Sequence, residues 1–173
     1  ERAWKTILTI TGLAILFILS SVSWLQVGYW RDSITLYRHT LGITDDNYII
    51  HYNMGNALLS RGKLDEALRH YTHGLRIEPE FYKPHNNMGL ILARKGKTDE
   101  AIRHYIKASA IGSVYSKAHN NMGNLFASQG NLDKAIHHYI QALQREPRFS
   151  NAHNNLGLCL LRKGKIQEAI DHR

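Results

Sequence analysis

Three groups of residues in this 173-residue sequence have types and spacings suited to chemistry: eleven histidines, a recurring pair of asparagines and a Gly-Lys-Thr triplet. The triplet at residues 96–98 has the form of the end of a phosphate-binding loop. Such a loop also needs a glycine five residues before the glycine of the triplet, and it follows a strand. Ile91 stands at that place, within a helical pattern, so we reject a nucleotide-binding loop.

The histidines recur at a fixed interval along the chain, which argues against a metal centre. One series consists of His51, His85, His119 and His153, and a second of His70, His104, His138 and His172. Equivalent members lie one repeat apart, whereas the ligands of a zinc ion lie about 2 Å from it. We therefore expect packing or surface histidines, with no metal and no cofactor. No motif of a serine hydrolase, zinc peptidase or thiol–disulfide enzyme occurs, so no catalytic site is predicted.

The same interval governs the second part of the chain. Copies of equal length follow one another without a gap, beginning at Tyr48, Tyr82, Ser116 and Ser150. Within each copy, apolar and small residues recur at steps of three and four residues, which is the period of an amphipathic helix. A glycine at position 15 of every copy supplies the left-handed residue that often ends a helix. Each copy is therefore predicted to form two helices.

The length and signature positions of these copies resemble the tetratricopeptide repeat, a helix–turn–helix unit of about 34 residues. Glycine occupies position 8 and alanine position 20 in all four copies, and tyrosine occupies position 24 in three. The resemblance implies an all-α, right-handed solenoid of antiparallel helix pairs. Residues 31–47 fit the second helix of a degenerate half repeat. The repeats then span residues 48–81, 82–115, 116–149 and, in truncated form, 150–173.

Asparagine dominates the positions that the resemblance places on a groove lined by the first helices. A carboxamide both donates and accepts hydrogen bonds, so a row of them can bind the main chain of an extended peptide. Such a row is similar to the asparagine ladder of O-linked N-acetylglucosamine transferase. Alternatively, these side chains pair with neighbouring helices. The expected peptide- or protein-binding groove comprises Asn53, Asn56, Lys83, Asn86, Asn87, Lys117, Asn120, Asn121, Asn124, Asn154 and Asn155.

The groove matches a more specific pattern only in part. Chaperone-binding tetratricopeptide repeats hold a carboxylate in a clamp of lysine, arginine and asparagine side chains. Asn56, Asn87 and Lys117 resemble members of that clamp. Tyr52 and Asn121, however, stand where basic residues are expected, so that clamp is not predicted.

Residues 6–30 carry no charged side chain and predict a membrane-spanning helix ahead of the repeats. As a helix this segment would be about 37 Å long, against about 30 Å for the hydrocarbon core of a bilayer. Residues 1–30 are therefore assigned to a transmembrane helix and its flank. A buried core helix and a signal peptide are the alternatives. Aromatic rings suited to the two bilayer interfaces lie at the ends of the segment: Trp4, Trp24, Tyr29 and Trp30.

The junction that follows this segment carries a second resemblance. Trp30, Asp32, Leu36 and Tyr37 resemble a pattern of transmembrane and tetratricopeptide repeat-containing proteins and their bacterial relatives. In those proteins a multi-spanning region precedes the repeats, and the resemblance implies repeats on the periplasmic side of a bacterial inner membrane. With its one apolar segment, this chain is expected to be a single-pass protein. We expect a membrane-anchored scaffold that binds a protein or assembles subunits. The alternative is the acceptor-presenting C-terminal region of a polytopic membrane glycosyltransferase.

The net charge of +8 arises after residue 46, because the preceding residues carry four basic and four acidic side chains. This excess favours acidic partners for the repeats. The expected partners are a protein or peptide segment, the lipid bilayer, and a second copy or membrane complex that covers the apolar end of the truncated repeat. Nucleic acid is not expected, because the basic residues at helix ends have a local role. The sequence thus predicts a binding protein and not an enzyme.

Overall fold

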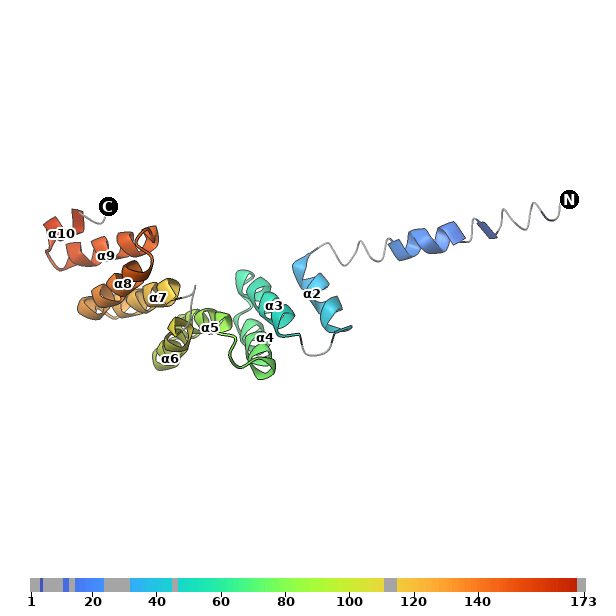
Figure 1. Cartoon of the computed structure of the whole chain (residues 1–173), viewed down its shortest axis with the longest axis horizontal. Helices are drawn as coiled ribbons and strands as arrows, with labels where there is room; N and C mark the ends of the chain where they lie inside the picture. Colours follow the sequence, from blue (N-terminus) through green and yellow to red (C-terminus); the bar gives the residue numbers. More distant parts are fainter. Residues whose placement is uncertain are drawn as a thin grey trace.

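The protein is seen in a computed structural model that describes residues 4, 11–12, 15–23, 32–44, 47–110 and 115–170. In the repeat region, helices follow one another as antiparallel pairs along the long axis of the molecule (Figure 1). No strand occurs among the described residues, and the predicted all-α solenoid of antiparallel helix pairs is confirmed. The helices are α2 (Ser33–Leu41), α3 (Tyr48–Ser60), α4 (Leu64–Ile77), α5 (Lys83–Arg94), α6 (Thr98–Ser109), α7 (Tyr115–Ser128), α8 (Leu132–Arg145), α9 (Ser150–Arg162) and α10 (Ile166–Ile170).

Each repeat turns from its first to its second helix at a glycine in the left-handed region. A residue with a Cβ is strained there, whereas glycine adopts this conformation without steric cost. The predicted helix ends are therefore confirmed at all four turns, where φ lies between 74° and 78°: Gly62, Gly96, Gly130 and Gly164.

A second glycine lets the two helices of a repeat approach closely. A Cβ built on Gly89 would lie 2.6 Å from Cε1 of Tyr105, so any larger side chain would displace the tyrosine ring. Tyr105 is only 1% exposed and lies in the core with Ala101 and Met122. The same arrangement recurs in the neighbouring repeats at Gly55 with Tyr71 and at Gly123 with Tyr139. Each tyrosine ring therefore lies between the two helices of its repeat, and its hydroxyl points towards the first helices.

Helix α2 lies against α3 ahead of the first full repeat, within the residues expected to form a half repeat. Asp32 caps it by accepting hydrogen bonds from the backbone N–H of Thr35 at 3.0 Å and from its hydroxyl at 2.9 Å. Arg61 then pairs with Asp32 across the junction at 3.5 Å. Ile34 is buried against the first repeat.

The apolar segment is described only in part. Residues 15–23 are helical, and their large apolar side chains are 50% to 74% exposed. Trp4 is likewise exposed, whereas Trp24, Tyr29 and Trp30 lie outside the described residues. In the described part of the chain, no helix combines the length and apolar character needed to cross a bilayer.

Candidate functional site

The first helices of consecutive repeats lie side by side, and a hollow opens between α5 and α7. Its volume is about 240 Å³. Helices α5 and α7 supply its walls, and Tyr105 of α6 reaches it from the core. We call it the α5–α7 hollow, and it is lined by Leu90, Ala93, Arg94, Tyr105, Asn121, Asn124, Leu125 and Ser128.

The asparagines at position 6 link each repeat to the one before it. Asn87 donates to Oδ1 of Asn56 at 2.8 Å, across the first junction, between residues 48–81 and 82–115. At the middle junction, between residues 82–115 and 116–149, the corresponding bond runs from Asn121 to Oδ1 of Asn86 at 3.0 Å. At the last junction, between residues 116–149 and 150–170, Asn155 donates to Asn120 at 3.1 Å and Asn124 at 3.0 Å.

These bonds decide where the expected groove residues lie. Asn86 is 9% exposed and Asn120 is 6% exposed, so their carboxamides are buried between helices. Their hydrogen bonds are those of the alternative interpretation, in which asparagines pair with neighbouring helices. Asn53, Asn56, Asn87, Asn121 and Asn155 are half-buried. The exposed members of the expected groove are Lys83, Lys117, Asn124 and Asn154.

The tyrosines at position 24 were noted in the sequence only as a signature of the repeat, and the role of their hydroxyl groups was missed. Tyr71 donates to Oδ1 of Asn56 at 2.7 Å, and Tyr139 donates to Oδ1 of Asn124 at 2.8 Å. The asparagine at position 9 therefore accepts from its own repeat's tyrosine and from the next repeat's asparagine. Burial raises the pKa of each tyrosine, so the hydroxyl keeps its proton as a donor.

A second feature missed by the sequence analysis is a histidine pair inside each of the first three full repeats. The Nδ1 atoms lie 3.0 Å apart in His51–His70, 2.9 Å apart in His85–His104 and 3.0 Å apart in His119–His138. Equivalent positions in different repeats lie far apart, whereas positions 4 and 23 of one antiparallel hairpin face each other. Among the described residues, no group of three or more His, Cys, Asp or Glu side chains gathers as a metal site.

Burial lowers the pKa of five of these histidines and favours their neutral form: His70, His85, His104, His119 and His138. Burial, followed by the neighbouring charge of His104 and Lys107, lowers the pKa of His85 to about 4. Burial likewise lowers the pKa of His119 to about 4, with His138 and His137 adding to the effect. A hydrogen bond between two Nδ1 atoms requires one ring to donate and the other to accept, so it is lost when both rings are protonated.

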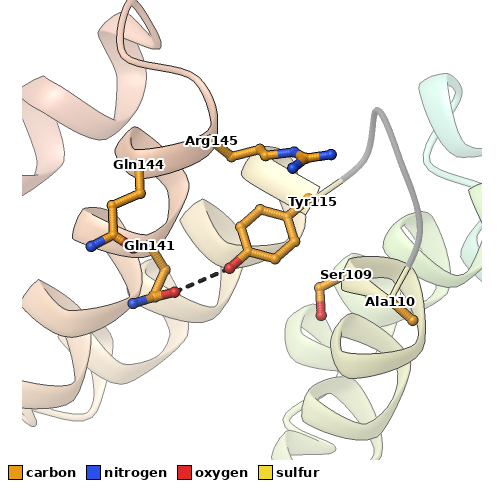
Figure 2. A pocket seen from close by; sticks show the side chains of 6 residues that line it. All are labelled: Ser109, Ala110, Tyr115, Gln141, Gln144 and Arg145. Carbon is orange, nitrogen blue, oxygen red and sulfur yellow. Dashed lines mark hydrogen bonds between the residues drawn. The ribbon is translucent and has the colours of Figure 1, made fainter.

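A second hollow of about 340 Å³ lies at the other side of the middle junction. Figure 2 shows Tyr115 bonded to Gln141, with Gln144 and Arg145 on the same side and Ser109 and Ala110 opposite. The hydroxyl of Tyr115 donates to Oε1 of Gln141 at 3.1 Å. Its polar groups are thus partly engaged with one another.

Comparisons with known proteins agree with this geometry. Tetratricopeptide repeat models match residues 82–145 and 120–172, and a TPR repeat model matches residues 55–96. No curated protein sequence matched the chain significantly.

Solved structures show the same fold at low sequence identity. MamA from Desulfovibrio magneticus RS-1 has a TM-score of 0.70 at 20% identity, covering 92% of this chain and 90% of that one. PilF of Pseudomonas aeruginosa has a TM-score of 0.65 at 24% identity, covering 72% of this chain and 57% of that one. YrrB, described as a TPR protein with an unusual peptide-binding site, has a TM-score of 0.64 at 19% identity, covering 79% and 70%.

Proposed function

Because this chain is a tetratricopeptide repeat protein, we propose that it is a scaffold that binds a protein segment over its first helices and catalyses no reaction. The α5–α7 hollow is the observation that carries the proposal. Polar side chains from α5, α6 and α7 converge there on a surface that remains open. The net charge of +8 favours an acidic segment. YrrB, which shares the fold, is described as having a peptide-binding site of its own.

A photo-crosslinking experiment tests where the partner binds. A benzoylphenylalanine placed at Ser128 would lie at the α5–α7 hollow, whereas one at Arg103 would lie exposed on α6. Irradiation of cells should give discrete protein adducts from position 128 and few from position 103, with partners identified by mass spectrometry. Adducts that form equally at both positions, or only at position 103, would contradict groove binding.

The scaffold is further proposed to be anchored in a bilayer by residues 1–30, as a single-pass protein of a bacterial inner membrane with periplasmic repeats. Support comes from the uncharged run at residues 6–30 and from the exposed apolar side chains of residues 15–23. Isolated apolar side chains are common on protein surfaces, but a contiguous exposed patch marks contact with a membrane or another protein.

Alkaline extraction of membranes tests the anchor. The chain should remain in the pellet, and a variant with Phe17→Asp and Leu19→Asp should shift to the supernatant, because a charge within the hydrocarbon core is costly. Ile106→Asp, an exposed change on α6, is the control and should leave the chain in the pellet. A wild-type chain found in the supernatant would contradict the anchor without touching the groove proposal.

A further inference from the structure

The middle junction differs from its neighbours at one side chain. The first and last junctions have an asparagine at position 9, Asn56 or Asn124, and that asparagine accepts two hydrogen bonds. The middle junction has Leu90 at the same position. An aliphatic side chain accepts no hydrogen bond, so the two donors that meet at this point in the other repeats lose their shared partner.

The first of these donors is the hydroxyl of Tyr105. Among the described residues it makes no hydrogen bond, although the equivalent hydroxyls of Tyr71 and Tyr139 each donate one to an asparagine. Tyr105 is 1% exposed, yet no fully enclosed side-chain oxygen or nitrogen of the described residues lacks a partner. Its hydroxyl is therefore reachable, and the opening that reaches it is the α5–α7 hollow.

The other groups around this hydroxyl are also donors. Asn121 uses one hydrogen of its amide on Asn86 and has a second, whereas Asn87 at the first junction bonds both Asn56 and Tyr71. Arg94 lies on the wall of the same hollow and contributes a positive charge near Tyr105. Within the described part of the chain, no acidic side chain lines the hollow.

We propose that the α5–α7 hollow binds a carboxylate of a peptide, with Tyr105, Asn121 and Arg94 as the donors. A buried hydroxyl without a partner is costly, and an anionic acceptor forms a stronger hydrogen bond than a neutral one. The apolar wall made by Leu90, Ala93 and Leu125 excludes water from one side of the bond. This inference rests on the proposed groove function and adds the chemistry of the group recognised.

Two kinds of peptide carboxylate fit this chemistry, namely an acidic side chain and a free C-terminus. We would titrate the full chain, with its tyrosine rings labelled at Cζ with carbon-13, with three N-acetylated alanine pentapeptides. One has a central glutamate and an amidated end, one is all alanine with a free carboxyl end, and one has a central glutamine and an amidated end. The shift of the Tyr105 resonance reports binding at this site in the wild type, and isothermal titration calorimetry gives the dissociation constant for the wild type and every variant.

Three substitutions make the test specific to this site. Leu90→Asn supplies the missing acceptor, so Tyr105 and Asn121 bond within the protein and the hollow loses its free donors. Tyr105→Phe removes the hydroxyl without breaking a bond inside the protein. Tyr139→Phe makes the same chemical change at the last junction, where the hydroxyl is already bonded to Asn124, and is the matched control.

At least one carboxylate peptide should shift Tyr105, and the responsive peptide tells which source is recognised. Leu90→Asn and Tyr105→Phe should each raise the dissociation constant of that peptide about tenfold, since a hydrogen bond to a charged group contributes at least this much to the binding free energy. Tyr139→Phe should leave its affinity unchanged.

Two outcomes would overturn the proposal, and they differ in what they leave standing. If all three peptides bind equally and neither Leu90→Asn nor Tyr105→Phe matters, the groove binds peptides but the carboxylate site is wrong. If no peptide shifts the resonance of any tyrosine facing the groove, and crosslinking at residue 128 also yields no partner, both the carboxylate site and the proposed function are wrong.

Discussion

The middle junction and its two neighbours are built on one pattern but joined by different chemistry. At the first and last junctions, a lysine at position 14 forms an ion pair with an aspartate of the preceding repeat, Lys95 with Asp65 and Lys163 with Asp133. At the middle junction, Gln129 occupies the lysine position and donates a neutral hydrogen bond to the hydroxyl of Thr98 at 3.4 Å in place of the ion pair. The described residues of that junction also lack the asparagine link at position 9. Among its described residues, the middle junction thus has neither the ion pair nor the position-9 asparagine of its neighbours, although it keeps the bond from Asn121 to Asn86.

The difference teaches that links between repeats and sites for ligands draw on the same side chains. Where Asn56 and Asn124 accept hydrogen bonds from the tyrosine hydroxyls, they link the two repeats, and these donors are no longer available to a ligand. Where Leu90 leaves Tyr105 without a partner, the junction has fewer hydrogen bonds and gains an open hollow with donors that are not used within the protein. Binding sites are commonly less stable than the structure could allow, because a group satisfied within the protein does not bind a ligand.

The largest expected effect is a loss of stability at low pH, which arises from the histidine pairs inside the repeats and not from the junctions between them. The folded-state pKa of His85 and His119, about 4, lies below the unfolded value of about 6.5. Below pH 6.5 the unfolded chain therefore binds more protons, and the free energy of unfolding should fall as the pH drops towards 4. Urea denaturation followed by circular dichroism at several pH values between 7 and 5 measures this slope.

A double variant, His85→Gln with His104→Gln, isolates the histidine contribution. It removes one of the three pairs and leaves every carboxylate in place, so its slope should be shallower than that of the wild type. All three pairs lie inside repeats, so the middle junction should not be affected more than the others. If the free energy of unfolding changes with pH equally in the two proteins, the neutral histidine pairs do not contribute to the stability of the repeats.

The next effect concerns the junctions that are fully linked. Asn124→Ala removes the acceptor for Tyr139 and for Asn155, and should lower the free energy of unfolding by about 2–3 kcal/mol. Asn56→Ala should act similarly at the first junction. Asn154→Ala is the control, because Asn154 is also exposed but takes part in none of the hydrogen bonds between repeats in the described part of the chain, and it should change the stability by less than about 0.5 kcal/mol. Urea midpoints that coincide for Asn124→Ala and Asn154→Ala would contradict the role of the link.

Much of this architecture could be predicted from the sequence, because helix pairs and turns are local features. The constant interval between copies placed each hairpin, and glycines such as Gly96 placed the turns. The histidine pairs also had a signal that was overlooked. In an antiparallel hairpin, positions that sum to about 28 face each other, as Gly89 faces Ala101, so positions 4 and 23 should have been compared.

The groove assignments were harder, because one residue of offset turns a helical side chain by about 100°. Asn86 and Asn87 are adjacent, yet Asn86 is buried between helices and Asn87 reaches back to Asn56. The angle between neighbouring first helices decides which carboxamide faces the open surface, and no local pattern specifies that angle. The sequence showed leucine at position 90, but only the positions of Tyr105 and Asn121 reveal what that leucine leaves unsatisfied.

A smaller effect compares the same substitution at two junctions. Tyr139→Phe removes a hydrogen bond to Asn124 and should cost about 1 kcal/mol, whereas Tyr105→Phe removes a hydroxyl without a partner and should cost almost nothing. Thermal denaturation of both variants in the absence of peptide gives the comparison, since the two rings are equally buried. If Tyr105→Phe destabilises the protein as much as Tyr139→Phe does, the hydroxyl of Tyr105 has a partner within the chain.

The smallest expected effect restores a link to the middle junction without closing the hollow. In Gln129→Lys, the new ammonium group should reach Asp99, as Lys95 reaches Asp65, and raise the free energy of unfolding by about 0.2–0.5 kcal/mol. Gln129→Met, with similar length and no charge, is the control. The gain should vanish in 1 M salt, where the Debye length is about 3 Å. A gain that persists in salt would come from packing or helix propensity, and the ion pairs would then not be what stabilises the other two junctions.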